Sequence, residues 1–153
     1  MAFNIYTIGA LDLAKDVPDW RNVLGRKLHD RGFNGVIFSP GDAYKSPNWG
    51  TYNPDRSRYI EDVNYAALTN SNLIVASVMK NIQSIGSSIE LEFANKCNIP
   101  IILMSDIGPG SSVYLDNRVS LDNWITTDMG VDSTLDKVVD RIFKMDNGQL
   151  GNS

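Results

Sequence analysis

The chain has 153 residues and a formal net charge of −4, with 42% hydrophobic and 21% charged residues. This size and composition are typical of one globular domain and differ from those of disordered chains. A surface that binds a nucleic acid polymer needs an excess of basic residues, so we expect no such partner.

Strands and helices alternate along the predicted chain. Short apolar runs indicate strands, and apolar residues at helical spacing indicate helices. In chain order we predict a strand at 3–8, a helix at 17–31, a strand at 36–38, a helix at 59–69, a strand at 73–76, a helix at 89–96, strands at 99–104 and 124–126, and a final helix from 132 or 133.

This alternation predicts a single-domain α/β fold of the doubly wound, Rossmann- or flavodoxin-like type. Its parallel sheet has five strands and carries helices on both faces. We expect the domain to span residues 1–145 and a flexible C-terminal tail to follow at 146–153. Ligands of such folds bind at the carboxyl ends of the strands, which points to the loops at 9–16, 39–58, 77–88 and 105–119.

The stretch from 42 to 58 is long, polar and aromatic, which is typical of a functional loop. Tyr44, Trp49 and Tyr52 could form a lid that stacks on a flat ligand. The alternative is a surface loop whose aromatic residues pack the loop against itself.

Cys97 is the only cysteine and His29 the only histidine. These counts exclude an intrachain disulfide, cysteine-based zinc clusters, Ser-His-Asp triads and HExxH metal sites. His29 lies in a segment typical of a solvated helix end. We expect neither a metal nor a cofactor.

The first 14 residues lack a basic start and carry Asp12, unlike a signal peptide. No apolar run approaches the length of a membrane span. We therefore expect a cytoplasmic protein with no membrane partner.

Several common ligand motifs are absent. The first strand leads into Gly9-Ala10-Leu11-Asp12, which is not the G-x-G-x-x-G dinucleotide fingerprint, and no P-loop motif occurs. Ser39 and Ser77 follow the next strands, where a response regulator would carry acidic residues. The remaining candidate is the Ser- and Gly-rich turn at 83–88, before the helix at 89–96.

This turn has two interpretations. Ser87 and Glu90 fit a capping box, which is a structural device. Alternatively, backbone N–H groups at Gly86, Ser87 and Ser88 bind a phosphate or sugar oxygen. The helix dipole would then stabilise the Glu90 carboxylate as an anion, which suits a nucleophile.

Tyr6-x-x-Gly9 in the first strand is followed later by Ile89-Glu90-Leu91-Glu92-Phe93-Ala94 and Ile99-Pro100-Ile101. With these motifs the chain resembles the nucleoside 2-deoxyribosyltransferase superfamily, which includes deoxynucleoside 5′-monophosphate N-glycosidases. The likeness runs from about residue 3 to 104. It implies that Glu90 is the catalytic nucleophile, that Tyr6 positions it, and that Gly9 belongs to the substrate site.

The sequence departs from the family pattern in the predicted second helix. Asn64 stands where the family usually has an aspartate that holds the sugar and assists the leaving base. An amide can hydrogen-bond a sugar hydroxyl, but it cannot donate a proton as an acid does. Asp62 lies two residues away and would need a shifted helix to bind substrate in its place.

Two further positions depart from the family pattern. Glu92 replaces a glycine that the family prefers, and it either alters a subunit contact or crowds the site. Asn72 replaces the aspartate that leads the family's third strand.

The resemblance also bears on the substrate. Ser84 lies six residues before Glu90, where the monophosphate glycosidases carry serine and the transferases tend to carry an acidic residue. A hydroxyl beside helix amides can bind a phosphate that a carboxylate would repel. Against this, the glycosidases' Ser- and Arg-rich first loop is absent here. Asn117, in the loop at 105–119, is a further candidate for substrate binding.

The expected reaction cleaves the N-glycosidic bond of a nucleotide, with 2′-deoxynucleoside 5′-monophosphates favoured, through a covalent glycosyl-Glu90 intermediate. The alternatives are a transferase that exchanges bases between deoxynucleosides and a nucleotide-binding protein with weakened catalysis. A cytokinin-activating phosphoribohydrolase is more distant, because the Pro-Gly-Gly motif before Gly86 is missing. Family members complete their sites with a neighbouring subunit, so we expect a homo-oligomer.

Overall fold

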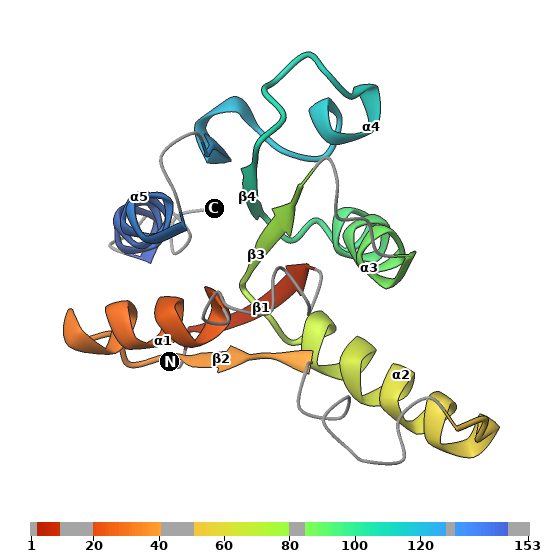
Figure 1. Cartoon of the computed structure of the whole chain (residues 1–153). Coiled ribbons are helices and arrows are strands. Elements are labelled where there is room, and N and C mark those ends of the chain that lie inside the picture. Colours follow the sequence, from red (N-terminus) through yellow and green to blue (C-terminus); the bar gives the residue numbers. More distant parts are fainter. Residues whose placement is uncertain (1–2, 10–19, 41–50, 80–84, 128–130, 147–153) are drawn as a thin grey trace.

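The computed structural model describes residues 3–9, 20–40, 51–79, 85–127 and 131–146. In this part of the chain, a parallel sheet with the strand order β2-β1-β3-β4-β5 carries helices on both faces, as predicted (Figure 1). The strands are β1 (Asn4–Gly9), β2 (Val36–Phe38), β3 (Leu73–Val78), β4 (Ile101–Ser105) and β5 (Trp124–Thr126). The helices are α1 (Trp20–Asp30), α2 (Pro54–Thr69), α3 (Ile85–Lys96), the short α4 (Val113–Asp116) and α5 (Val131–Lys144).

The strand order reverses between β1 and β3. From β1 the chain runs outward to β2 and then returns through α2 to β3, which pairs with the other side of β1. Gly9 and Ser77 are partners at the carboxyl end of this pair, and a Cβ on Gly9 would lie 3.0 Å from the Ser77 carbonyl oxygen. Gly9 therefore allows the strands to approach at the point where doubly wound sheets bind ligands.

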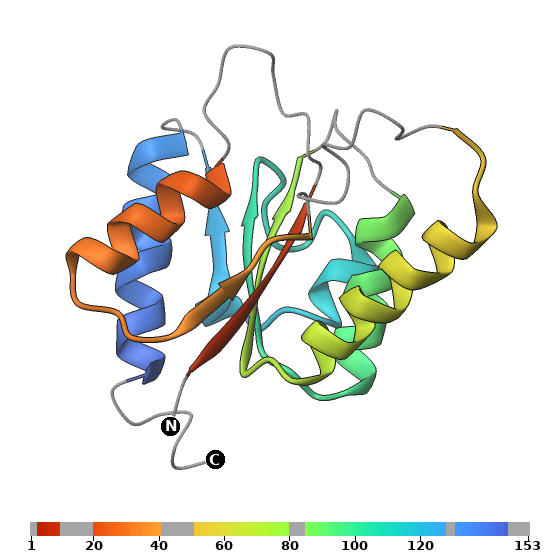
Figure 2. The same ribbon diagram turned by 90° about the horizontal axis from the view of Figure 1, so that it is seen from below.

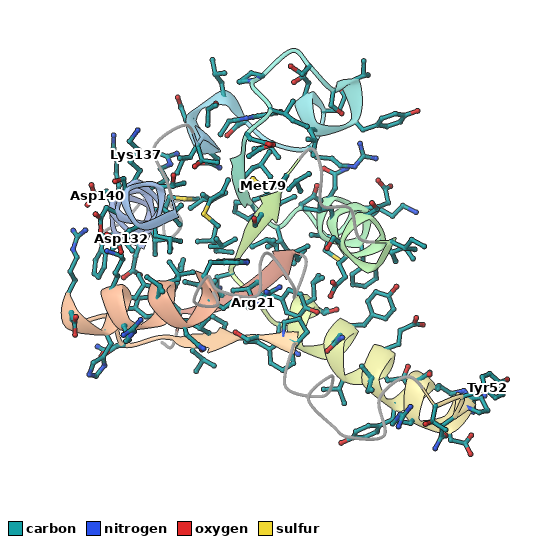
Figure 3. All side chains as sticks on the ribbon, in the orientation of Figure 1. Arg21, Tyr52, Met79, Asp132, Lys137 and Asp140 are labelled. Carbon is teal, nitrogen blue, oxygen red and sulfur yellow. The ribbon has the colours of Figure 1, made fainter. Side chains whose placement is uncertain are left out.

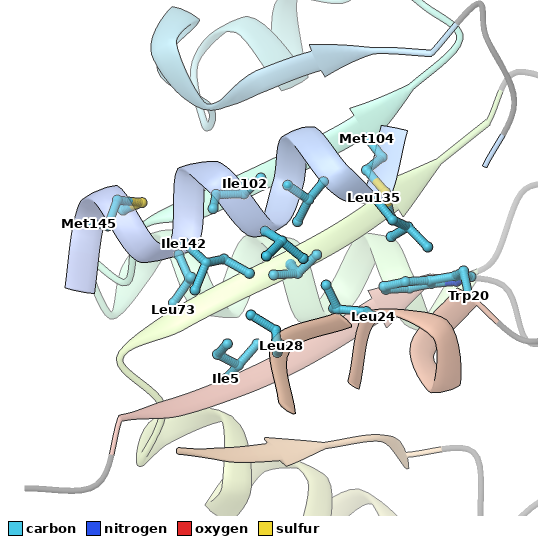
Figure 4. Close-up of a cluster of buried hydrophobic side chains, with 13 residues drawn as sticks. Ile5, Trp20, Leu24, Leu28, Leu73, Ile102, Met104, Leu135, Ile142 and Met145 are labelled. Atoms are coloured by element: carbon cyan, nitrogen blue, oxygen red, sulfur yellow. The ribbon is translucent and has the colours of Figure 1, made fainter. Parts of the chain in front are cut away.

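The sheet has a hydrophobic cluster on each face, because successive strand residues point to opposite sides. Helices α1 and α5 cover one face, and α2, α3 and α4 cover the other (Figure 2). Figure 4 shows the first cluster. It contains Ile5, Leu73, Val75 and Ile102 from the strands, with Trp20, Leu24 and Leu28 from α1 and Leu135, Val138 and Ile142 from α5. The second contains Tyr6, Ile8, Ile74 and Leu103, with Leu68 from α2 and Leu91 and Ala94 from α3.

Helix α2 begins five residues earlier than predicted. The Asn53 side chain accepts a hydrogen bond of 3.0 Å from the Arg56 amide, and Pro54 occupies the start of the helix. Both features stabilise a helix start. The predicted functional loop therefore ends before Pro54.

Helix α3 also begins early, at Ile85 instead of residue 89. Ser87 consequently lies inside the helix, so the interpretation of Ser87 and Glu90 as a capping box is wrong. Glu90 lies in the second turn, where the helix dipole has little effect, and the expected stabilisation by that dipole is also wrong.

The other boundaries lie close to the predicted ones. Strands β2 and β5 match, β3 continues two residues further to Val78, β4 is displaced to Ile101–Ser105, and α5 begins at Val131. Residues 147–153 of the predicted tail lie outside the described residues. No helix in the described ranges is long and apolar enough to cross a membrane.

Candidate active site

A tyrosine from the sheet holds a glutamate from helix α3. The Tyr6 hydroxyl donates a hydrogen bond to Oε2 of Glu90, although the two residues are 84 positions apart. The Tyr6 side chain is fully buried, and its ring stacks on Phe38 with centroids 5.3 Å apart and planes at 13°. Because the core fixes the phenol, the phenol in turn fixes the orientation of the carboxylate.

Glu90 lines a pocket of about 220 Å³ between one face of α2 and the N-terminal half of α3. The α2 side contributes residues at helical positions i, i+3, i+4, i+7 and i+8, which share one face. The lining residues are Ser57, Ile60, Glu61, Asn64 and Tyr65 from α2, with Gly86, Ile89 and Glu90 from α3. No group of three or more His, Cys, Asp or Glu side chains that could hold a metal occurs among the described residues.

Larger hollows lie elsewhere on the described surface. One of about 470 Å³ runs beside α5 and β5, and another of about 350 Å³ lies along α1. Both are more open than the Glu90 pocket, and Glu90 lines neither. We therefore place the candidate active site at Glu90.

The surroundings of Glu90 act on its charge in opposite directions. Partial burial raises the pKa of Glu90, whereas the Tyr6 hydrogen bond and the positive charge of Arg21 lower it. Burial has the larger effect, so the pKa of Glu90 is raised overall. A carboxylate perturbed by desolvation and by specific partners, in a pocket, is a candidate for catalysis.

Arg21, which the sequence analysis missed, acts on Glu90 through its charge but does not line the pocket. Its side chain is buried at the carboxyl end of β1, where Nε donates to Thr7 Oγ1 at 3.1 Å and Nη2 donates to the Gly9 carbonyl at 2.8 Å (Figure 3). The guanidinium also lies 4.7 Å from the centre of the Trp20 ring. No motif marks Arg21, because its place depends on how α1 packs against β1.

Glu61 and Tyr65 were also missed. Both line the pocket, and the Tyr65 ring packs on Phe93 with centroids 4.7 Å apart. Desolvation and the negative charges of Glu61 and Glu90 raise the pKa of Tyr65. Helical spacing could have found both residues, because both lie within the helix predicted at 59–69 and share a face with Asn64.

Among the predicted residues of α2, Asn64 lines the same pocket as Glu90. Asp62 is exposed and is not among the lining residues, as the geometry of an unshifted helix requires. Tyr52 precedes α2, its side chain is 90% exposed, and it does not line the pocket (Figure 3). Tyr44 and Trp49 lie outside the described residues.

The described end of the Ser- and Gly-rich turn contributes one residue to the pocket lining. Gly86 lines the pocket in the first turn of α3, whereas Ser87 is buried within the helix and Ser88 is exposed, with neither among the lining residues. Asn117 is exposed at the end of α4 and does not line the pocket either. Ser84 lies outside the described residues.

Two departures from the family pattern have structural roles. Glu92 accepts a hydrogen bond of 2.9 Å from Nε of Arg118, and this partner lowers the pKa of Glu92. Glu92 does not line the pocket, so it does not crowd the site. The Asn72 side chain accepts a hydrogen bond of 2.8 Å from the Asn4 amide and so connects the starts of β3 and β1.

Comparison with known proteins yields similarity in structure but not in sequence. No family model and no curated protein matches the sequence. A 2-deoxyribosyltransferase from Bacillus psychrosaccharolyticus matches with a TM-score of 0.62 and 14% identity, over 89% of this chain and 90% of the other. A conserved protein from Enterococcus faecalis V583 matches with a TM-score of 0.60 and 12% identity, over 94% and 99%.

A CMP N-glycosidase from Clostridium botulinum also matches, with a TM-score of 0.52 and 15% identity, over 88% of this chain and 97% of the other. At such identities the likeness shows a shared fold. The fold that the sequence resemblance implied is therefore confirmed, and it extends over most of the chain.

Proposed function

We propose that this chain cleaves the N-glycosidic bond of a nucleotide with Glu90 as the nucleophile. The observation that carries the proposal is the hydrogen bond from the buried Tyr6 hydroxyl to Glu90, beside a pocket that Asn64 also lines. The structural likeness to a 2-deoxyribosyltransferase and to a CMP N-glycosidase supports this class of reaction.

The proposed reaction has two displacements at the anomeric carbon. A carboxylate oxygen of Glu90 bonds to C1′ while the C1′–N bond breaks. The electron pair of the C1′–N bond leaves with the base, and the base takes up a proton. Water then bonds to C1′, the ester bond to Glu90 breaks, and the water gives up a proton. The sum is nucleotide plus water giving free base plus sugar phosphate.

The residues around Glu90 have separate roles in this scheme. Tyr6 orients the carboxylate, and Arg21 favours its ionised, nucleophilic form. Asn64 hydrogen-bonds a sugar hydroxyl. The pocket is smaller than the roughly 300–1,000 Å³ of most small-molecule sites, which suits the sugar more than a whole nucleotide.

We further propose 2′-deoxynucleoside 5′-monophosphates as the preferred substrates. Gly86 lines the pocket in the first turn of α3, where backbone N–H groups can bind phosphate oxygens. The serine at position 84 supports the same preference by its place in the family pattern. A homo-oligomer whose neighbouring subunit completes the site stays a prediction.

A panel of nucleosides and nucleotides, including CMP and deoxy-CMP, tests the proposal through the base released, measured by chromatography. Monophosphates should release base faster than the matching nucleosides. A base-exchanging transferase would instead form a new nucleoside when a second base is added. A binding protein would shift in melting temperature with the nucleotide but release no base.

Glu90→Gln should remove nearly all base release, and Glu92→Gln, a matched change on the same helix away from the pocket, should not. A Glu90→Gln variant that keeps more than about a tenth of the activity would contradict the nucleophile assignment.

A further inference from the structure

Breaking an N-glycosidic bond leaves a base that must take up a proton, and Asn64 cannot supply one. We propose that Glu61 is the catalytic residue that gives this proton to the leaving base and later accepts one from the attacking water. This role rests on the proposed function and adds a residue to the same site.

The position of Glu61 supports the role. Glu61 and Asn64 both line the pocket that contains Glu90, and they are three residues apart on one face of α2. The rise of a helix separates them by about 4.5 Å along the axis, with Glu61 nearer the N-terminus. A glutamate side chain is one methylene longer than an aspartate, which makes up part of this separation.

The other lining residues on the described part of the chain are poorer acids. The Ser57 hydroxyl and the Asn64 amide hold their protons too strongly to act as general acids near neutral pH. Tyr65 carries a phenol, but desolvation and the charges of Glu61 and Glu90 raise its pKa and make it a weaker acid still. Glu90 is needed as the nucleophile. Glu61 is the remaining group.

The Glu61 side chain is exposed in the free protein and lines the pocket, so a base that enters the pocket can contact its carboxyl group.

The proton steps balance over the cycle. The Glu61 carboxyl proton moves to the base as the electron pair of the C1′–N bond moves onto it. A proton of the incoming water then returns to the Glu61 carboxylate, while the water oxygen bonds to C1′ and the bond from C1′ to Glu90 breaks. This alternation of acid and base is the general logic of two-carboxylate glycoside hydrolysis.

The test compares Glu61→Gln with the wild type on two substrates. One is the nucleotide that the wild type cleaves fastest, and the other is the 4-nitrophenyl glycoside of the same sugar 5′-phosphate, whose leaving group departs without a proton. We expect kcat/KM to fall about 100-fold or more on the nucleotide and less than about threefold on the nitrophenyl substrate.

Two further variants sharpen the result. Asn64→Asp in the Glu61→Gln background should restore part of the rate on the nucleotide, because it returns a carboxyl to the neighbouring turn. Asp55→Asn removes the same charge from α2 at a side chain that is 92% exposed and outside the pocket lining, and it should leave both rates unchanged.

Equal losses on the two substrates in Glu61→Gln would overturn the proposal, and so would a nucleotide-selective loss in Asp62→Asn. A wild-type protein that releases no base from any nucleoside or nucleotide would instead contradict the proposed function itself, and with it this role.

Discussion

Tyr6 donates a hydrogen bond to Glu90 and so favours the ionised form of this carboxyl group. The Tyr6 hydroxyl lowers the pKa of Glu90 against the effect of burial, so Tyr6→Phe should raise that pKa further. A larger share of Glu90 is then protonated, and the acid limb of kcat/KM should move to higher pH. At neutral pH the rate should fall about 10-fold, because a hydrogen bond to a charged group is lost. A pH–rate profile measures this, and an unmoved acid limb would contradict it.

The same pKa predicts that Glu90 destabilises the folded protein when it is ionised. A carboxyl whose pKa is raised by folding contributes stability below its unfolded pKa, and this is lost as pH rises through the folded pKa. Glu90→Gln should therefore raise the melting temperature at pH 7.5. The difference from the wild type should shrink as the pH falls through the raised pKa of Glu90 and should no longer change below the ordinary glutamate value of 4.5. A variant less stable than the wild type at pH 7.5 would contradict this sign.

The sequence indicates some site residues far better than others. Tyr6, Asn64 and Glu90 follow from family motifs. In the structure Asn64 and Glu90 line one pocket, and Tyr6 hydrogen-bonds Glu90. No local sequence motif identifies Arg21, because the packing of α1 on β1 brings its charge close enough to act on Glu90. Its electrostatic role therefore needed the tertiary structure.

At the scale of elements, the start of α2 determines the outer half of the pocket. Ser57, Ile60 and Glu61 lie in its first two turns, just after the Asn53 cap. Asn53→Ala should lower the free energy of unfolding by about 1 kcal/mol, because the Arg56 amide loses its acceptor. Asn53→Asp keeps the capping oxygen and should retain the stability. Urea denaturation measures both, and equal losses in the two variants would contradict the capping role.

The boundaries of α2 and α3 also show where sequence patterns mislead. Apolar periodicity identifies the middle of each helix, but the starts depend on capping and on polar first turns that resemble loops. The Asn53-Pro54 pair was a usable signal for α2. For α3 the signal was ambiguous, because Ser84 and Ser87 are both of a residue type that fits a cap position, and Ser87 lies inside the helix.

At the scale of the whole molecule, the site lies on one face of the sheet, and the hydrophobic cluster on the other face contributes stability away from the pocket. Leu28 of α1 is fully buried in the cluster under α1 and α5, and it does not line the Glu90 pocket. Leu28→Ala should lower the free energy of unfolding by about 2–5 kcal/mol. Without denaturant, kcat and KM should stay unchanged, and the neighbouring exposed change His29→Ala should alter neither stability nor rate. A lower kcat in Leu28→Ala with the fold intact would contradict this separation.

The fold class, the five-stranded parallel sheet and the helices on both faces were predictable, because alternating apolar runs and amphipathic segments allow few other topologies. The strand order and the pairing of Gly9 with Ser77 were not predictable, because no local sequence pattern indicates that two residues 68 positions apart are in contact. The position of the site at the reversal of strand order followed once that order was known.

The central claim is that Glu90 bonds covalently to the sugar, and trapping that bond tests it most directly. A 2′-fluoroarabino analogue of the best substrate should form the ester and release it slowly, because fluorine disfavours the oxocarbenium-like transition state of the second step. Mass spectrometry of the intact protein and its peptides should then show one sugar phosphate attached at Glu90, and none on Glu90→Gln. An adduct on another residue, or full turnover of the natural substrate by Glu90→Gln, would contradict the account.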